Sequence, residues 1–121
     1  MSDHVETLGG QQVLVCAADG PPLAGEREAS DLVGEALSTG AEWVALPLER
    51  LEPAFLRLSS GLAGAVLQKF VNYRCCVAVV GDVGPAVESS ESLAAFVRES
   101  NRGRTVWFVR DLAELEARLG G

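Results

Sequence analysis

The sequence predicts a single α/β domain with a mostly parallel, mixed sheet of about five strands covered by helices. Short runs of β-forming residues alternate with segments whose apolar residues recur every three or four positions, as in amphipathic helices. The later strand runs are almost wholly apolar, which is typical of parallel strands covered on both faces. The length of 121 residues fits one domain, so we expect residues 1–121 to fold as one unit.

The first third predicts a hairpin followed by a helix. Strands over 3–8 and 12–17 flank Gly9 and Gly10, because glycine readily adopts the positive φ of tight turns. A helix begins near Glu26 and ends at Gly40. Its predicted buried face consists of Ala29, Leu32, Val33, Ala36 and Leu37. Residues 43–46 form the next strand, and Pro47 ends it.

Residues 58–82 predict one amphipathic helix that leads into one buried strand. Pro53 suits the first position of a preceding helical turn, and Ser59 or Ser60 is expected to cap the helix through its hydroxyl. The predicted buried stripe consists of Ala63, Val66, Leu67, Phe70 and Val71. Residues 75–80 form the most apolar run, so we expect a central parallel strand there.

The last third predicts two more helices around one strand. Ser89, Ser90 or Ser92 caps a helix whose inner residues are Leu93, Phe96 and Val97, and residues 101–103 end it with a glycine or asparagine in the left-handed region. Residues 105–109 form the final strand. Asp111 and Glu114 form a capping box that opens the last helix. The predicted order is β-β-α-β-α-β-α-β-α, with right-handed crossovers.

Composition excludes several classes of protein. The net charge of −7 argues against a nucleic-acid binder, whose affinity comes from clustered Lys and Arg. No apolar run reaches the ~18 residues of a membrane span, and the first residues lack a basic leader, so a soluble cytoplasmic protein is expected. Cys16, Cys75, Cys76 and the single His4 lack the paired spacing of metal ligands. We therefore expect buried thiols, no metal and no cofactor.

Several short sequence motifs resemble those of a known family. These are residues 61–64 (GLAG), 68–70 (QKF), 72–74 (NYR), 80–82 (VGD) and 99–103 (ESNRG). They resemble, over nearly the whole chain, the bacterial family catalogued as domain of unknown function 4180. That resemblance implies family membership and brings no activity with it.

A second resemblance concerns the element order and the residues 59–62 (SSGL) at a helix start, which are similar to STAS domains, the bacterial anti-sigma-factor-antagonist fold. The resemblance implies that a serine at this helix start is phosphorylated by a partner kinase and that the helix forms the partner-binding surface. By position the phospho-acceptor would be Ser59. Leu58 stands where that family has an acidic residue.

Two candidate sites follow from the predicted architecture. Ser59, Ser60 and Gly61 lie at a helix start, where free N–H groups and a partial positive charge can hold an anion, although serine is also an ordinary N-cap. The carboxyl edge of the sheet is the usual place for a ligand, near a switch in strand order. Polar residues expected there, which also suit turns and caps, are Asp19, Glu49, Arg50, Asp82, Arg110 and Asp111.

Two surfaces are further candidates. The polar helix face of Gln68, Lys69 and Asn72 is a partner surface under the STAS-like hypothesis and an ordinary solvated face otherwise. A basic group is either a partner patch or a set of cations that complement helix dipoles; its members are Lys69, Arg74, Arg98, Arg102 and Arg104. Trp43, Trp107 and Phe108 are expected in the core.

The leading functional hypothesis is a non-enzymatic regulatory or protein-interaction module, because the sequence shows no nucleophile–base pair and no phosphate loop. The alternative is a small-molecule-binding protein or small enzyme that uses the carboxyl edge of the sheet. A homo-oligomer formed through the edge strand at 3–8 is a third hypothesis, since an edge strand leaves backbone groups unpaired.

Overall fold

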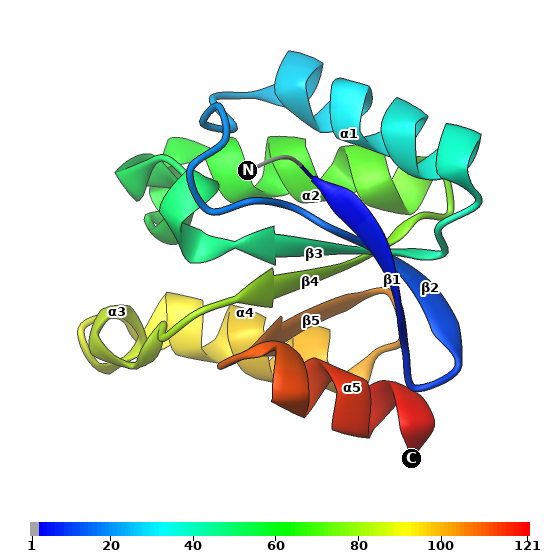
Figure 1. Cartoon of the computed structure of the whole chain (residues 1–121). Helices are drawn as coiled ribbons and strands as arrows, with labels where there is room; N and C mark the ends of the chain where they lie inside the picture. Colours follow the sequence, from blue (N-terminus) through cyan, green and yellow to red (C-terminus); the bar gives the residue numbers. More distant parts are fainter. Residues whose placement is uncertain (1–2) are drawn as a thin grey trace.

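The computed structural model describes residues 3–121 and confirms the predicted mixed sheet. Within these residues, five strands lie in the order β1-β2-β3-β4-β5 (Figure 1). The pairing of β1 with β2 is antiparallel, and the other three pairings are parallel. The strands are β1 (His4–Leu8), β2 (Gln11–Val15), β3 (Trp43–Pro47), β4 (Cys76–Val80) and β5 (Val106–Val109).

The helices follow the predicted order with one addition. They are α1 (Glu26–Thr39), α2 (Leu62–Asn72), α3 (Gly84–Glu88), α4 (Glu91–Arg102) and α5 (Leu112–Gly120), with short 3-10 turns at Leu48–Arg50, Pro53–Leu56 and Leu58–Ser60. The short helix α3 is the α-helix that the sequence does not predict. Pro85 lies in its first turn, where its fixed φ suits a helix start. None of the helices described in residues 3–121 is long and apolar enough to cross a membrane.

Strand order determines which helices cover which face of the sheet. Consecutive strands are neighbours, and crossovers of one hand then place their helices on one face. Accordingly α1, α2 and α4 cover the face that carries Leu14, Val77 and Phe108. The opposite face, with Trp43 and Trp107, packs against α5. The rings of these two tryptophans are 4.4 Å apart between centroids, which confirms both as core residues.

The turn of the β1–β2 hairpin contacts the C-terminal end of α5. Gly9 and Gly10 form the two-residue turn between β1 and β2, with φ of 57° and 84°. A Cβ on Gly9 would lie 2.5 Å from the Gly120 nitrogen and 2.7 Å from the Leu119 Cβ. The helix therefore crosses the sheet from β5 to the opposite edge strand β1, and it rests against the glycine.

The predicted caps of α1, α4 and α5 are confirmed. Gly40 ends α1 in the left-handed region, with φ of 78°. The Ser90 Oγ accepts a hydrogen bond from the Leu93 N–H at 3.2 Å, and the Asp111 Oδ1 accepts one from the Glu114 N–H at 2.8 Å. The capping box differs in one detail, because the Glu114 Oε1 accepts from the Arg110 N–H and not from that of Asp111.

The predicted left-handed cap at residues 101–103 is wrong. Gly103 has φ of −83°, in the ordinary region, and ends α4 in an extended conformation. Asn101 serves another purpose, since its Oδ1 accepts a hydrogen bond from the Phe108 N–H of β5 at 2.7 Å. The side chain is thus used to join α4 to the edge of the sheet.

The buried stripes of α1 and α2 are narrower than predicted. Leu37 is 58% exposed and Val71 is 39% exposed, although both were expected in the core. Each follows directly after the last buried residue of its stripe, Ala36 or Phe70. One step along a helix rotates the side chain by about 100°, which takes these two side chains past the sheet and into solvent.

The three cysteines are free thiols, as expected. Cys16 and Cys75 are buried, and Cys76 is half-buried. Burial raises the pKa of Cys16 to about 12, with a further contribution from the negative charge of Asp3. Burial also raises the pKa of Cys75 to about 11 and raises that of Cys76. Loss of solvent disfavours the charged thiolate, so these thiols are poor nucleophiles.

Thiol alkylation should follow this order. At pH 8 the thiolate fraction of Cys16 falls from roughly one in ten at its ordinary pKa to roughly one in ten thousand. Iodoacetamide should therefore modify Cys76 first and Cys16 last in the native protein, and all three at similar rates in urea. Peptide mass spectrometry over time measures this. Modification of native Cys16 at the rate seen in urea would contradict the assigned burial.

The packing of α5 on the hairpin can be tested with two neighbouring glycines. Gly9→Ala should lower the free energy of unfolding by about 2–4 kcal/mol, because the methyl group meets α5 and the positive φ is unfavourable. Gly10→Ala is the matched control, since Gly10 also has positive φ but has open space around its Cβ position; it should cost about 1 kcal/mol. Urea unfolding measures both, and equal losses would contradict the contact.

Candidate functional site

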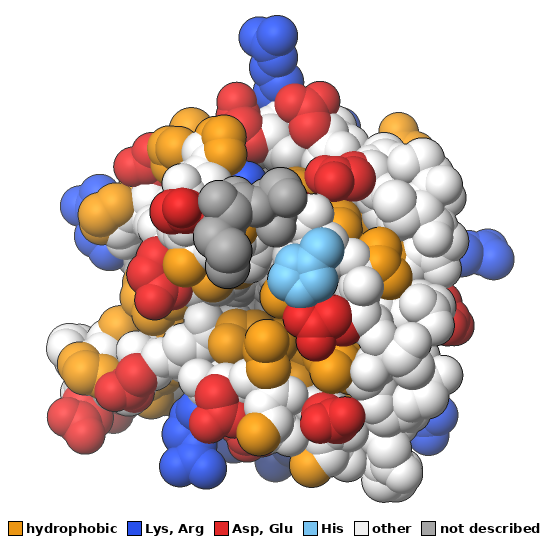
Figure 2. Space-filling view, viewed as in Figure 1, with side chains coloured by type: hydrophobic (Ala, Val, Ile, Leu, Met, Phe, Trp, Pro, Cys, Tyr) orange, Lys and Arg blue, Asp and Glu red, His pale blue; other side chains and the backbone are white. Residues whose placement is uncertain are grey.

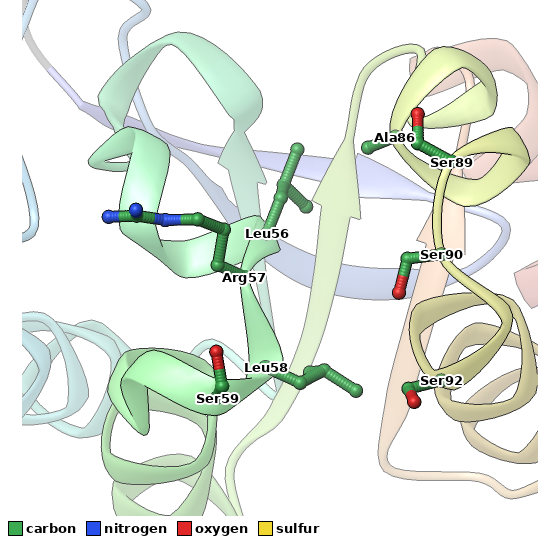
Figure 3. Close-up of a pocket in the computed structure, with 8 residues that line it drawn as sticks. All are labelled: Leu56, Arg57, Leu58, Ser59, Ala86, Ser89, Ser90 and Ser92. Carbon is green, nitrogen blue, oxygen red and sulfur yellow. The ribbon is translucent and has the colours of Figure 1, made fainter.

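A cleft of about 690 Å³ lies at the carboxyl edge of the sheet, between the segment that follows β3 and the segment that follows β4 (Figure 3). One wall comes from the 3-10 turns before α2, and the other comes from α3 and the start of α4. The lining residues are Leu56, Arg57, Leu58, Ser59, Ala86, Ser89, Ser90 and Ser92.

The first wall is positioned by a buried aromatic anchor. Pro53 starts a 3-10 turn, and Phe55 within it is only 1% exposed. Anchoring Phe55 in the core leaves Leu56 and Leu58 partly buried. Figure 3 shows the Leu58 side chain directed across the cleft toward Ser92, while Arg57 is directed away from the cleft.

The second wall is rich in hydroxyl groups. The Ser89 Oγ donates to the Pro85 carbonyl at 2.8 Å, and the Ser90 Oγ serves as the cap of α4. The side chains of Ser90 and Ser92 face the two leucines across the cleft in Figure 3. The cleft thus has an apolar wall opposite a hydroxyl-bearing wall.

The predicted anion-site residues separate in the structure. Gly61, with φ of 79°, occupies the N-cap position of α2, so neither predicted serine holds that position, although the Ser60 hydroxyl does accept from an N–H of the first helical residue, Leu62. The Ser60 Oγ instead joins two turns: it donates to the Ala54 carbonyl at 2.6 Å and accepts from the Leu62 N–H at 3.2 Å. Ser59 is exposed and lines the cleft. Of the three residues, Ser59 is therefore the one that faces the site.

Arg50, a predicted pocket residue, is buried and tied to three segments. Its side chain is 6% exposed. The Nε donates to the Pro21 carbonyl at 2.9 Å, and Nη1 donates to the Asp3 Oδ1 at 2.9 Å. The same Asp3 oxygen accepts from the Ala17 N–H at 2.8 Å. Arg50 thus joins the crossover after β3 to the start of β1 and to the loop after β2.

The other predicted pocket residues also lie outside the cleft lining. Asp82 is exposed, and its Oδ1 accepts from the Gly84 N–H at 2.9 Å, which shapes the turn into α3. The Arg110 Nε lies 3.8 Å from the Glu114 Oε1 on the surface. Asp111 caps α5, and Asp19 and Glu49 are exposed. The cleft consequently has no pair of carboxylates for acid–base chemistry.

Several side chains of the predicted partner surfaces make hydrogen bonds or ion pairs within the chain. The Gln68 Nε2 donates to the Asn72 Oδ1 at 2.7 Å, and the Lys69 Nζ lies 3.5 Å from the Glu26 Oε1 of α1. In the basic group, the Arg102 Nη1 is 3.1 Å from the Glu99 Oε1. Arg74, Arg98 and Arg104 are exposed.

The cleft presents apolar side chains and hydroxyl groups. Within residues 3–121 strand order follows chain order, so the described sheet has no switch point of the kind where ligands of α/β folds usually bind. Residues 3–121 contain no group of three or more His, Cys, Asp or Glu side chains placed to hold a metal ion. Apolar walls and hydroxyls can bind a ligand, but they do not supply an activated nucleophile.

The chain is a small α/β domain with a cleft at the carboxyl edge of a mostly parallel sheet. The chain matches the family model described as Domain of unknown function (DUF4180) over residues 8–119, and it belongs to that family. The family membership expected from the sequence is thereby confirmed. No curated protein and no solved structure matches the chain.

Of the residues that line the cleft, Ser59 is the one that the sequence analysis named as a candidate site residue. Ala86, Ser89 and Ser92 were not assigned to the site, because α3 was not predicted. Two signals were present: Gly84-Pro85 after Asp82, which favours a new helical turn, and a cluster of serines before a helix.

The structural role of Arg50 can be tested by substitution. Arg50→Met should lower the free energy of unfolding by about 3 kcal/mol or more, because it removes the cation that pairs with the mostly buried Asp3 carboxylate and the side-chain donor of the Pro21 carbonyl. Arg102→Met breaks an ion pair whose partners are 69% and 67% exposed, and it should change stability by less than about 0.5 kcal/mol. Chemical unfolding of both variants measures the difference, and similar losses would contradict this role.

Proposed function

We propose that this domain is a non-enzymatic regulatory module that binds a segment of a partner protein in the carboxyl-edge cleft. The observation that carries the proposal is the chemistry of the lining. Leu56, Leu58 and Ala86 supply apolar surface, and serine hydroxyls line the other side. Among the described residues that line the cleft, Arg57 alone is ionisable, and its side chain points away from the cleft.

A protein segment suits this lining. An apolar side chain can be buried between the two leucines and Ala86, which removes apolar area from water. Serine hydroxyls both donate and accept, so they can satisfy the backbone N–H and C=O groups that accompany such a side chain. No charged side chain drawn in Figure 3 is directed into the cleft, so the lining offers no ion-pair partner to a charged ligand.

The STAS-like resemblance supports a regulatory role. It rests on the element order and on the serine before α2, and Ser59 is exposed at the cleft. A phosphate on Ser59 would add a charge of about −2 next to an apolar wall and would oppose burial of an apolar side chain there. This module would then be released from its partner by phosphorylation.

The alternative is a small-molecule-binding protein that uses the same cleft. The volume of about 690 Å³ favours it, because ligand sites commonly measure roughly 300–1,000 Å³. Both functions place the occupant against the same residues, so one set of variants can separate them.

Filling the cleft should abolish partner capture. We expect Ala86→Trp to reduce recovery of a specific partner from lysate of the native host at least about tenfold, since the indole occupies the space between the walls. Ala113→Trp is the matched control, because Ala113 is exposed on α5 outside the cleft. Ser59→Asp should weaken capture, and Gln68→Ala should not. Quantitative mass spectrometry of the captured proteins is the readout.

Two outcomes would contradict the proposal. Equal capture by wild type and Ala86→Trp would place the partner elsewhere. A rise in melting temperature with a small metabolite, lost in Ala86→Trp and accompanied by no captured protein, would favour the small-molecule alternative.

A further inference from the structure

The two edges of the sheet differ in how their outward backbone groups are satisfied. On β5, the carbonyls of Thr105 and Val109 accept from β4, so Val106, Phe108 and the following Arg110 face outward. The Phe108 N–H donates to the Asn101 Oδ1 and the Arg110 N–H donates to the Glu114 Oε1, each at 2.7 Å. Side chains of this chain thus close the β5 edge against another strand.

The β1 edge shows no such closure among the contacts of the described residues. The Gln12 carbonyl accepts from the Glu42 N–H on the β3 side, so Gln12 and Leu14 point away from β1. Their antiparallel partners Thr7 and Val5 consequently direct their N–H and C=O groups to the outer edge. In Figure 1, β1 lies at the border of the sheet. It contains neither lysine nor proline, two residues that commonly protect edge strands.

We propose that β1 pairs with β1 of a second copy of this chain, antiparallel about a two-fold axis at Val5. Such a pairing exchanges backbone hydrogen bonds between the two Val5 residues and between Asp3 and Thr7 of opposite copies. It joins the two sheets into one continuous sheet. This dimer uses a surface that is separate from the carboxyl-edge cleft.

Charge selects this register. With Val5 on the axis, His4 of one copy lies opposite Glu6 of the other, which is a favourable cross-strand pair. Shifting the axis to Glu6 would keep outward residues paired but would place Glu6 opposite Glu6, which is unfavourable. Within one chain the His4 Nε2 already contacts the Glu6 carboxylate. Figure 2 shows this side of the molecule, with the one histidine in pale blue beside an acidic side chain and apolar side chains close by.

A second copy fits this edge better than an unrelated strand. A two-fold pairing presents the same short sequence to itself, so both His4–Glu6 contacts form together. The strand is also well supported from behind. Leu8 is buried, Val5 packs on the core beneath α1, and α5 rests on Gly9. The edge is therefore held in the extended conformation that pairing requires, at little further cost in entropy.

The first test is the mass of the full chain in solution by light scattering and sedimentation. We expect the dimer mass for wild type. Thr7→Pro should shift the equilibrium to monomer at least about tenfold, because proline removes an outward N–H, and an open strand edge tolerates it. Thr7→Val is the matched control, since it keeps the N–H and the side-chain shape, and it should remain dimeric. Circular dichroism shows whether each variant is folded.

Disulfide trapping tests the register without relying on proline. In a Cys76→Ala background, Val5→Cys should cross-link two copies on oxidation, because paired Cα atoms lie about 5.5 Å apart. Thr7→Cys should not, since the two copies of residue 7 are then roughly 14 Å apart along the strands. The native Cys16 and Cys75 are buried and do not interfere.

Three results would overturn the proposal. They are a monomeric wild type at concentrations up to about 1 mM, a dimer that folded Thr7→Pro leaves intact, and cross-linking of Thr7→Cys without that of Val5→Cys. A monomeric wild type whose β1 edge pairs with an extended segment of another protein would also overturn the proposal.

Discussion

The sequential order of the strands is the constraint on which the rest of this domain depends. Each parallel strand is added next to the one before it, so α1, α2 and α4 all cover one face. The other face carries two tryptophans and would be open to water without α5. The nine-residue helix α5 therefore has to cover this face by itself. It does so by crossing the sheet from β5 to the β1–β2 hairpin. The glycine at position 9 exists in this setting because any side chain there would push the helix away.

The carboxyl edge is organised by a different kind of interaction. Three long connections leave this edge, and a buried guanidinium holds two of them together with the start of β1. Gly20 is part of the same arrangement, since a Cβ there would lie 2.7 Å from the Arg50 guanidinium carbon. With Arg50 and Phe55 fixed in the interior, the turns before α2 have little freedom. The wall formed by Leu56 and Leu58 thus packs directly against the core, which suits a preformed binding site.

The parts of the fold that the sequence predicts are those set by local chemistry. The hairpin glycines, the caps at Ser90 and Asp111, and the apolar run of β4 follow from propensity and periodicity. Features that depend on contacts between residues far apart in the chain could not be predicted in this way. Whether Arg50 faces solvent or binds Asp3 depends on contacts 47 residues apart, and the exposure of Leu37 depends on where the sheet ends beneath α1. The same limit explains the site: polar residues near strand ends were identified, but tertiary contacts decided which of them face the cleft.

The contact between Gly9 and the end of α5 joins the first hairpin to the last helix, so the two halves of this core are separated by almost the whole chain. During synthesis, the sheet can assemble with α1, α2 and α4 as they leave the ribosome, because each packs on strands already made. The tryptophan-bearing face has to wait for residues 112–120. A chain that lacks residues 112–120 would leave the apolar, tryptophan-bearing face of its sheet exposed to water, and such a surface promotes aggregation and binds chaperones.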